Sequence, residues 1–186
     1  STSSSAVSIN LLSSTYSSGD ADGDTLTSIE NITGSDYADI LIGDSQNNIL
    51  TGGGGGDQLN GSGGSDTASY STSSSAVSIN LLSSAYSGGD ADGDSLTSIE
   101  NIIGSDYADL IIGDSQNNSL NGGSGNDTLY GGEGSNTYTG GSGDDFAVFN
   151  FARSSTTSIS STSVTTSTQT ETLSGIEGKA FLEVNH

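Results

Sequence analysis

Large apolar residues recur at every ninth position over much of the chain, and glycine-rich polar stretches separate them. Residues 122–148 read GGSGNDTLY, GGEGSNTYT and GGSGDDFAV, three consecutive units close to the form G-G-x-G-x-D-x-U-x, where U is apolar. Glycine permits the six-residue turn because it adopts positive φ without steric cost. In the remaining three residues, strand alternation sends U to one face and its neighbours to the other. The pattern therefore predicts short β-strands joined by tight turns, with U facing the interior.

Nine such units follow one another in phase, some in each half of the chain. They begin at Gly34, Gly43, Gly52, Gly61, Gly104, Gly113, Gly122, Gly131 and Gly140. Their eighth positions, expected to form the core, are Leu41, Leu50, Leu59, Ala68, Ile111, Leu120, Leu129, Tyr138 and Ala147. A single unit carries little information, whereas a long series in phase indicates a repeat architecture.

Two units form one flattened coil of eighteen residues, so each turn is expected to lie over the turn eighteen residues earlier, about 4.8 Å away. This stacking sorts the sixth positions into columns: Asp39 with Asp57, Asn48 with Asp66, Asp109 with Asp127 and Asp145, and Asn118 with Asn136. Stacked carboxylates repel one another unless a cation lies between them. A site of carboxylate and carbonyl oxygens suits Ca²⁺ better than zinc or copper. The aspartate columns are therefore the best candidate calcium sites, whereas the asparagine column either binds weakly or closes through amide hydrogen bonds.

The chain also contains an internal duplication, because residues 1–50 and 71–120 align without gaps and agree at 43 of 50 positions. We expect a first β-roll copy over residues 1–70 and a second over residues 71–151, with one additional unit and a closing rung. Residues 152–186 form a C-terminal extension. Its serine- and threonine-rich part is typical of linkers, but its threonines and β-branched residues also favour a strand or clasp.

Each copy opens with AVSINLL, at residues 6–12 and 76–82, which predicts a strand with valine and isoleucine on one face. A GDADGD loop follows in each copy. Further candidate metal ligands are the loop residues Asp20, Asp22, Asp24, Asp90, Asp92 and Asp94, together with Asp36 and Asp106. An EF-hand is excluded because Thr25 stands where its loop needs glycine and Glu30 comes one position early. An irregular calcium loop and a solvated acidic turn both remain open.

Composition narrows the functional classes. The 23 acidic residues face only two basic ones, and the net charge of −21 argues against nucleic-acid binding, which needs a basic surface. The chain has no cysteine, and its one histidine is the last residue, His186, so most nucleophile–base pairs are unavailable. Paired carboxylates can hydrolyse glycosides, but nearly every aspartate has a structural place in a turn, so we expect no enzymatic activity. The apolar runs are too short for membrane insertion.

Up to about residue 151, the repeated GGxGxDxUx units resemble the RTX family of calcium-binding nonapeptide repeats, and DDFAVFNF at residues 144–151 resembles the closing rung of such rolls. The resemblance implies an all-β fold, a right-handed parallel β-roll or β-helix solenoid with several Ca²⁺ ions in its turns. It also implies a secreted, extracellular protein that is unfolded in the calcium-poor cytosol and folds outside the cell.

The phase of the repeats favours self-association. The sequence STSSSAVSIN opens the chain with no preceding unit, whereas its second occurrence follows GSGGSDTASY directly, and residues 140–149 form an equivalent terminal unit. We therefore expect the terminal unit of one molecule to stack on the N-terminal strand of the next, giving a head-to-tail filament or adhesive fibre at the cell surface or in the matrix. The alternative is an excised C-terminal module of a larger secreted adhesin or exoenzyme, in which the roll aids secretion and folding.

Overall fold

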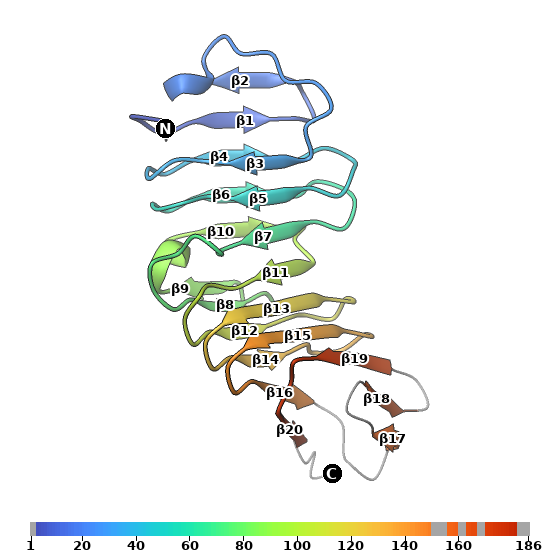
Figure 1. Cartoon of the computed structure of the whole chain (residues 1–186). Coiled ribbons are helices and arrows are strands. Elements are labelled where there is room, and N and C mark those ends of the chain that lie inside the picture. The colour runs from blue at the N-terminus through green and yellow to red at the C-terminus, as the bar shows by residue number, and fades with distance from the viewer. Residues whose placement is uncertain (1–2, 150–155, 160–162, 167–169, 182–186) are drawn as a thin grey trace.

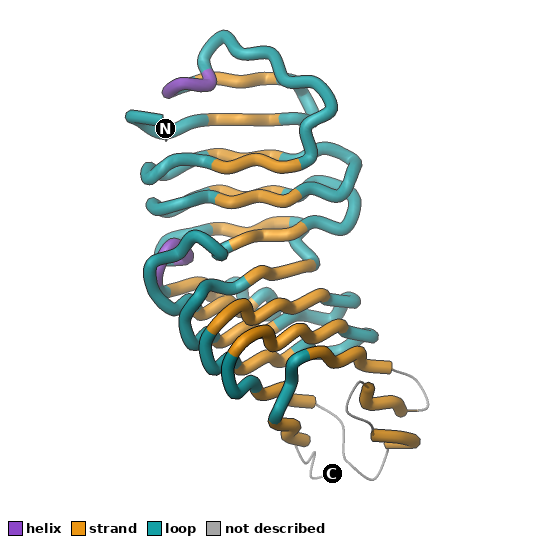
Figure 2. Tube along the Cα trace, viewed as in Figure 1, coloured by secondary structure: helices purple, strands orange, loops and turns teal. Residues whose placement is uncertain are grey.

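A computed structural model describes residues 3–149, 156–159, 163–166 and 170–181. The chain winds into a solenoid of stacked strands, from the N-terminus at one end to the C-terminal strands at the other (Figure 1). Apart from two short 3-10 turns, the regular structure of the described residues is all strand (Figure 2). The predicted all-β class is therefore confirmed.

The elements alternate with short turns along both copies. The first copy contributes β1 (Ser8–Asn10), β2 (Thr15–Ser17), η1 (Gly19–Ala21), β3 (Asn31–Thr33), β4 (Ile40–Ile42), β5 (Ile49–Thr51), β6 (Gln58–Asn60) and β7 (Thr67–Ser69). The second copy contributes β8 (Ser78–Asn80), β9 (Ala85–Ser87), η2 (Gly89–Ala91), β10 (Ser95–Thr97), β11 (Asn101–Ile103), β12 (Leu110–Ile112), β13 (Ser119–Ser124), β14 (Thr128–Tyr130), β15 (Thr137–Ser142) and β16 (Phe146–Phe149). The C-terminal extension contributes β17 (Thr156–Ile159), β18 (Ser163–Thr166), β19 (Thr170–Ser174) and β20 (Gly178–Phe181).

The strands form two faces of the solenoid. One face is a single sheet that runs through both copies, in the order β17-β18-β19-β15-β13-β11-β7-β5-β3. The opposite face is divided into β10-β6-β4-β1-β2 and β20-β16-β14-β12-β8-β9. This break lies at the junction of the two copies, near η2, where the stack also changes direction (Figures 1 and 2). One continuous sheet therefore joins the copies across the bend.

Neighbouring rungs of the nonapeptide units are parallel, and their strands are offset by eighteen residues, whereas the opening strands β1 and β8 pair with β4 and β12 at an offset of 32 residues. Leu41 of β4 pairs with Leu59 of β6, and Leu120 of β13 pairs with Tyr138 of β15. The predicted eighteen-residue coil is therefore confirmed. Parallel pairing continues across the junction, where β7 pairs with β11 and β6 pairs with β10.

The eighth positions of the units fill the interior between the two faces. Every one of the predicted core side chains, from Leu41 to Ala147, is at most 1% exposed. Burying a leucine-sized side chain contributes about 1.5–3 kcal/mol, so this row supplies most of the apolar driving force. At the C-terminal end of the row, the rings of Tyr138 and Phe149 pack edge to face with centroids 5.4 Å apart.

The start of each copy differs from the prediction. The opening strands are shorter than residues 6–12 and 76–82, since β1 and β8 cover three residues each. Each then turns back into an antiparallel partner, β2 or β9, where we expected only a loop. The reversals use Ser14 and Ser84 at φ +51° and +53°, a conformation that serine rarely adopts. The sequence therefore lacks the glycine signal that usually marks such a turn.

Part of the C-terminal extension packs on the end of the roll. Strands β17 and β18 form an antiparallel hairpin, and β18 continues antiparallel to β19. Strand β19 pairs in parallel with β15, and β20 pairs in parallel with β16. The terminal unit that we expected to be open at residues 140–149 is thus covered by the chain's own tail. Phe151 and His186, singled out above, lie outside the described residues.

Candidate metal-binding turns

The side chains at the sixth positions form hydrogen-bonded columns along the edges of the solenoid. In each stacked pair, the side chain of the later sixth residue accepts the backbone N–H of the sixth residue eighteen positions earlier: Asp39 N–H donates to Asp57 Oδ1 (2.8 Å), and Asp109 N–H donates to Asp127 Oδ1 (2.9 Å). Asp127 N–H donates in turn to Asp145 Oδ1 (2.9 Å). The other edge repeats this arrangement with the pairs Asn48–Asp66 and Asn118–Asn136. The structure therefore brings together the columns that the eighteen-residue spacing predicts.

Acidic residues outside the nonapeptide units close the columns. Asp57 N–H donates to Asp94 Oδ1 (2.8 Å), and Asp66 N–H donates to Glu100 Oε2 (2.9 Å). At the end of the second copy, Glu171 Oε2 accepts from Asn136 N–H (2.8 Å) and Glu177 Oε2 accepts from Asp145 N–H (2.9 Å). Sequence analysis missed the two glutamates of the tail and Glu100. The available signal was the similarity of LTSIEN at residues 96–101 to LSGIEG at residues 173–178.

The second side-chain oxygen divides the turns into two kinds. In the turns that begin at Gly34 and Gly104, the N–H of Ser35 or Ser105 donates to Oδ2 of the sixth-position aspartate. In the turns that begin at Gly43 and Gly113, the N–H of Asp44 or Asp114 likewise donates to Oδ1 of the sixth-position asparagine. We call these four the closed turns, because the turn backbone itself satisfies the side chain.

The five remaining turns begin at Gly52, Gly61, Gly122, Gly131 and Gly140, and we call them the open turns. Their second and fourth residues have positive φ, for example Gly123 at +103° and Gly125 at +118°. No residue of the closed turns does so. In the four open turns with a sixth-position aspartate, Oδ2 is buried without a hydrogen-bond partner; these residues are Asp57, Asp66, Asp127 and Asp145. A buried unpaired carboxylate oxygen is costly, so these oxygens require another partner.

Burial also changes the acidity of these groups. Desolvation raises the pKa of Asp57 to about 7, with added repulsion from Asp94, Asp39 and Asp90. Desolvation likewise raises the pKa of Asp127 to about 6, with repulsion from Asp109 and Asp145. The pKa of Asp66 is raised for the same leading reason. The open turns therefore hold negative charge that the protein alone stabilises poorly.

The open turns fit a calcium ion. A Cβ atom at Gly61 would clash with both Asp66 Oδ2 and the carbonyl oxygen of Ser98, and one at Gly140 would clash with Asp145 Oδ2 and the carbonyl oxygen of Gly175. Carboxylate and carbonyl oxygens thus converge at Gly61 and Gly140, as they also do at Gly34 and Gly104 of the closed turns, and Ca²⁺ prefers such oxygen ligands. Among the described residues, no three acidic or histidine side chains could hold a metal by themselves. Backbone carbonyls would therefore complete the ligand set.

The other predicted ligands lie outside this arrangement. Six of them are exposed: Asp20, Asp22, Asp24, Asp36, Asp92 and Asp106. Asp90 is half-buried, and desolvation together with repulsion from Asp36 raises its pKa. Asp94 is the exception, because its Oδ1 closes a column by accepting from Asp57 N–H, and its Oδ2 also accepts from the Tyr70 hydroxyl (2.9 Å). The role of all these residues as metal ligands stays a prediction, as it does for the sixth-position residues of the open and the closed turns.

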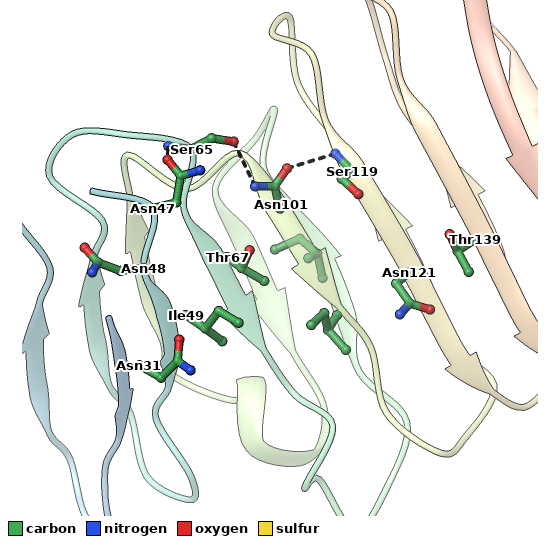
Figure 3. A pocket seen from close by; sticks show the side chains of 12 residues that line it. Asn31, Asn47, Asn48, Ile49, Ser65, Thr67, Asn101, Ser119, Asn121 and Thr139 are labelled. Carbon is green, nitrogen blue, oxygen red and sulfur yellow. Dashed lines mark hydrogen bonds between the residues drawn. The ribbon is translucent and has the colours of Figure 1, made fainter. Parts of the chain in front are cut away.

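A polar groove lies on the continuous sheet and is bordered by the turn residues Asn47, Asn48 and Ser65 (Figure 3). It has a volume of about 590 Å³ and is lined by asparagine, serine, threonine and isoleucine, with no charged side chain. Asn101 spans the copy junction there, because its Nδ2 donates to Ser65 Oγ (3.0 Å) and its Oδ1 accepts from Ser119 N–H (3.1 Å). Within the groove, Asn101 therefore links the last unit of the first copy to β13 of the second.

Comparison with protein families gives one match. The model of the RTX calcium-binding nonapeptide repeat, which describes four copies of the repeat, matches residues 33–68, 97–129 and 112–147. Comparison with curated proteins gives no significant match. The matched residues contain both the open and the closed turns, and repeats of this family bind calcium ions and are typical of secreted proteins. In the described residues, no helix is long and apolar enough to cross a membrane. With its parallel roll and its buried unpaired aspartates, this chain carries calcium-binding repeats of the RTX nonapeptide family over residues 33–68 and 97–147.

Proposed function

We propose that this chain is an extracellular structural roll whose folding depends on calcium and which assembles head to tail into a surface filament or adhesive fibre. The observation that carries the calcium dependence is the set of four buried Oδ2 atoms without a partner in the open turns. Calcium supplies the missing partner and neutralises the charge. Because the ligands come from turns that stack only in the folded roll, the binding free energy is folding free energy.

The net charge supports the same conclusion. A chain of −21 repels itself when compact, and the aspartate columns concentrate that repulsion at the edges of the roll. Extracellular calcium modules commonly have dissociation constants of about 10⁻⁴–10⁻³ M. A roll of that affinity is folded outside the cell and unfolded at cytosolic calcium. This difference is useful to a protein that must be exported before it folds.

The copy junction supports assembly. Within one chain, β10 and β11 of the second copy, at residues 95–103, stack on the last units of the first, with parallel pairing on both faces. The first copy has almost the same sequence at residues 25–33, so the end of another roll offers it an equivalent surface. A contact between different surfaces of identical molecules extends into a filament when its rotation does not close into a ring.

The second candidate is a module of a larger secreted adhesin or exoenzyme, in which the roll aids secretion and folding. The observation that favours it is again the junction, since it accepts a preceding roll in the same polypeptide as readily as one in another molecule. In this case the calcium-dependent fold persists, and the isolated chain stays monomeric.

A calcium titration of the purified chain, followed by far-UV circular dichroism and light scattering together, tests both parts. A β-sheet signal that appears with calcium and disappears with a chelator supports the calcium-folded roll. A parallel rise in scattering supports assembly. Folding without scattering removes the filament and leaves the module. A spectrum that is indifferent to calcium contradicts the proposal at its base.

A further inference from the structure

One ten-residue segment occurs three times in the chain, and we call it the docking segment. Its copies are DTLTSIENIT at residues 24–33, DSLTSIENII at residues 94–103 and ETLSGIEGKA at residues 171–180. They align without gaps, and all three share the same leucine, isoleucine and glutamate, with an acidic first residue. The third copy lies in the tail, where the surrounding serine- and threonine-rich sequence conceals it.

The second and third docking segments bind the roll in the same way. Each donates two backbone N–H groups to the sixth residue of the last unit: Glu100 and Asn101 to Asp66 O (3.1 and 2.9 Å), and Glu177 and Gly178 to Asp145 O (3.1 and 2.9 Å). In the opposite direction, the N–H of that sixth residue donates to Glu100 or Glu177. The acidic first residues, Asp94 and Glu171, accept equivalently on the other edge.

The strand registers of the second and third docking segments agree as well. Leu96 of the second segment pairs with Leu59, and the equivalent Leu173 of the third segment pairs with Tyr138. Ser98 and Gly175, which turn the segment from one face to the other, have φ of +50° and +59°. The tail therefore covers the end of the second copy in the same way as residues 94–103 cover the end of the first copy.

The first docking segment has no such surface beneath it. No described residue donates a hydrogen bond to the carboxylate of Asp24 or Glu30, and Asn31 N–H has no described acceptor. Ile29 is 38% exposed, whereas its counterpart Ile99 is 6% exposed. Residues 25–27 form no strand, although residues 95–97 form β10. This end of the roll thus presents a complete docking segment with its binding groups free.

We propose that the tail segment 171–180 is an exchangeable cap, and that residues 24–33 of a second copy displace it from the unit at residues 136–149. This proposal rests on the head-to-tail assembly proposed above. It specifies the unit at residues 136–149 as the surface for the second copy and the tail segment as the competitor for that surface. The two segments make the same backbone contacts, so they exclude one another. The tail has Lys179 and Ala180 at the register positions of Ile102 and Ile103. The first segment has Ile32 and Thr33 there, so it brings an isoleucine to the position of the tail's lysine.

The chain has no cysteine, so the exchange can be trapped with single disulfides. Thr139 pairs with Ser174 of the cap, and by equivalence with Asn60–Thr97 it would pair with Thr27 of a second copy. In calcium under oxidising conditions, T27C/T139C is expected to give a ladder of covalent oligomers. The matched control N60C/T97C reproduces the same contact inside one chain and is expected to give only monomer. Absence of the ladder, with the control cross-linked, overturns the proposal.

A locked cap provides the complementary test. Oxidised T139C/S174C ties β19 to β15, and we expect the protein concentration needed for scattering to rise by at least about tenfold, with full recovery in reductant. N31P, which removes the free N–H of the first segment, is expected to block assembly in reductant too. Equal scattering from the oxidised and reduced protein overturns the exchange while leaving assembly by another surface intact. No scattering from any variant overturns both the exchange and the filament, and the circular dichroism titration decides the calcium roll separately.

Discussion

The open and closed turns occupy equivalent places in the same roll, yet they satisfy their sixth residue differently. In the closed turn at Gly104, Asp109 Oδ2 accepts from Ser105 N–H and Oδ1 also accepts from Ser105 Oγ (2.8 Å). In the open turn at Gly122, the positive φ of Gly123 and Gly125 accompanies an unpartnered Asp127 Oδ2. The column bond to the neighbouring rung is the same in both.

The difference shows that the aspartate alone does not define a binding turn. A turn whose backbone N–H points at the carboxylate completes its own hydrogen bonding, and a cation would have to compete with that donor. A turn with positive φ at the second position directs the N–H elsewhere and leaves the oxygen for a metal. Each copy begins with two closed turns and continues with open ones, so the two kinds of turn are segregated along the roll.

The largest effect is expected at the fourth position of an open turn. A Cβ atom at Gly55, where φ is +118°, would lie 2.6 Å from Tyr37 C and 2.8 Å from Ala38 N, in the rung below. G55A combines a disfavoured backbone with this overlap and should destabilise the calcium-bound roll by about 2–4 kcal/mol in chemical denaturation. At the neighbouring Gly54 the nearest atom is 3.8 Å away, so G54A should change stability by less than about 1 kcal/mol. Equal losses from both would mean that the turn geometry is not limiting.

A smaller effect separates the two kinds of aspartate. D127N removes the charge of an open-turn carboxylate, so the calcium midpoint should rise by roughly tenfold, equivalent to about 1.4 kcal/mol. D109N removes a carboxylate that Ser105 already satisfies, so its midpoint should move much less. Isothermal calorimetry and the circular dichroism titration measure both. The distinction between the turns fails if D109N weakens calcium binding as much as D127N.

The pH dependence should reverse with calcium. In the folded, metal-free chain the pKa values of Asp57 and Asp127 are raised to about 7 and about 6, against about 3.9 when unfolded. Carboxyls with raised folded pKa contribute stability that is complete below the unfolded value and is lost as pH rises through the folded one. The metal-free chain should therefore lose thermal stability between about pH 4 and pH 7. With saturating calcium the ionised form is the bound one, so acidification over this range should lower stability.

Far-UV circular dichroism of the dialysed protein across this range, with and without calcium, checks both signs, because the metal-free chain should gain β-sheet signal as the pH falls. The double variant D57N/D127N should make the metal-free profile less steep, because two of the groups with raised pKa no longer titrate. Metal-free stability that increases from about pH 5 to pH 7 would contradict the assignment of raised pKa values to these aspartates.

Much of this architecture can be predicted from periodicity, because the roll is built from local rules. A nine-residue period with glycine turns fixes the coil, and alternation fixes the inward residues, so every eighth position from Leu41 to Ala147 is found in the core. The eighteen-residue offset likewise gives the columns. These inferences hold because a solenoid contacts mainly its nearest neighbours, and sequence separation translates directly into position.

Three features escape this reasoning for physical reasons. The hairpins at the start of each copy turn at Ser14 and Ser84 in the left-handed region, so no glycine marks them. Glu171 and Glu177 accept hydrogen bonds from residues 35 and 32 positions earlier in the chain, and the eighteen-residue period does not predict contacts at those separations. The closed turns at Gly34 and Gly104 keep the sixth-position aspartate, but its Oδ2 accepts a backbone N–H of the turn, because the second and fourth residues decide where that N–H points.

The smallest effect would come from converting one kind of turn into the other. S105G/Y107G changes GSDYAD at residues 104–109 into GGDGAD, which has glycine at both positions that take positive φ in open turns. Tyr107 is largely exposed, so its loss removes little core. The metal-free chain should become slightly less stable, because Asp109 Oδ2 loses the Ser105 N–H donor, and calorimetry should detect additional calcium binding.

The control S105A/Y107A removes the hydroxyl and the ring but keeps non-glycine residues at both positions. It should therefore retain the Ser105-type closure through the backbone N–H, with no added calcium. If both double variants bind the same amount of calcium as the parent, backbone conformation at these positions does not decide which turns take the ion.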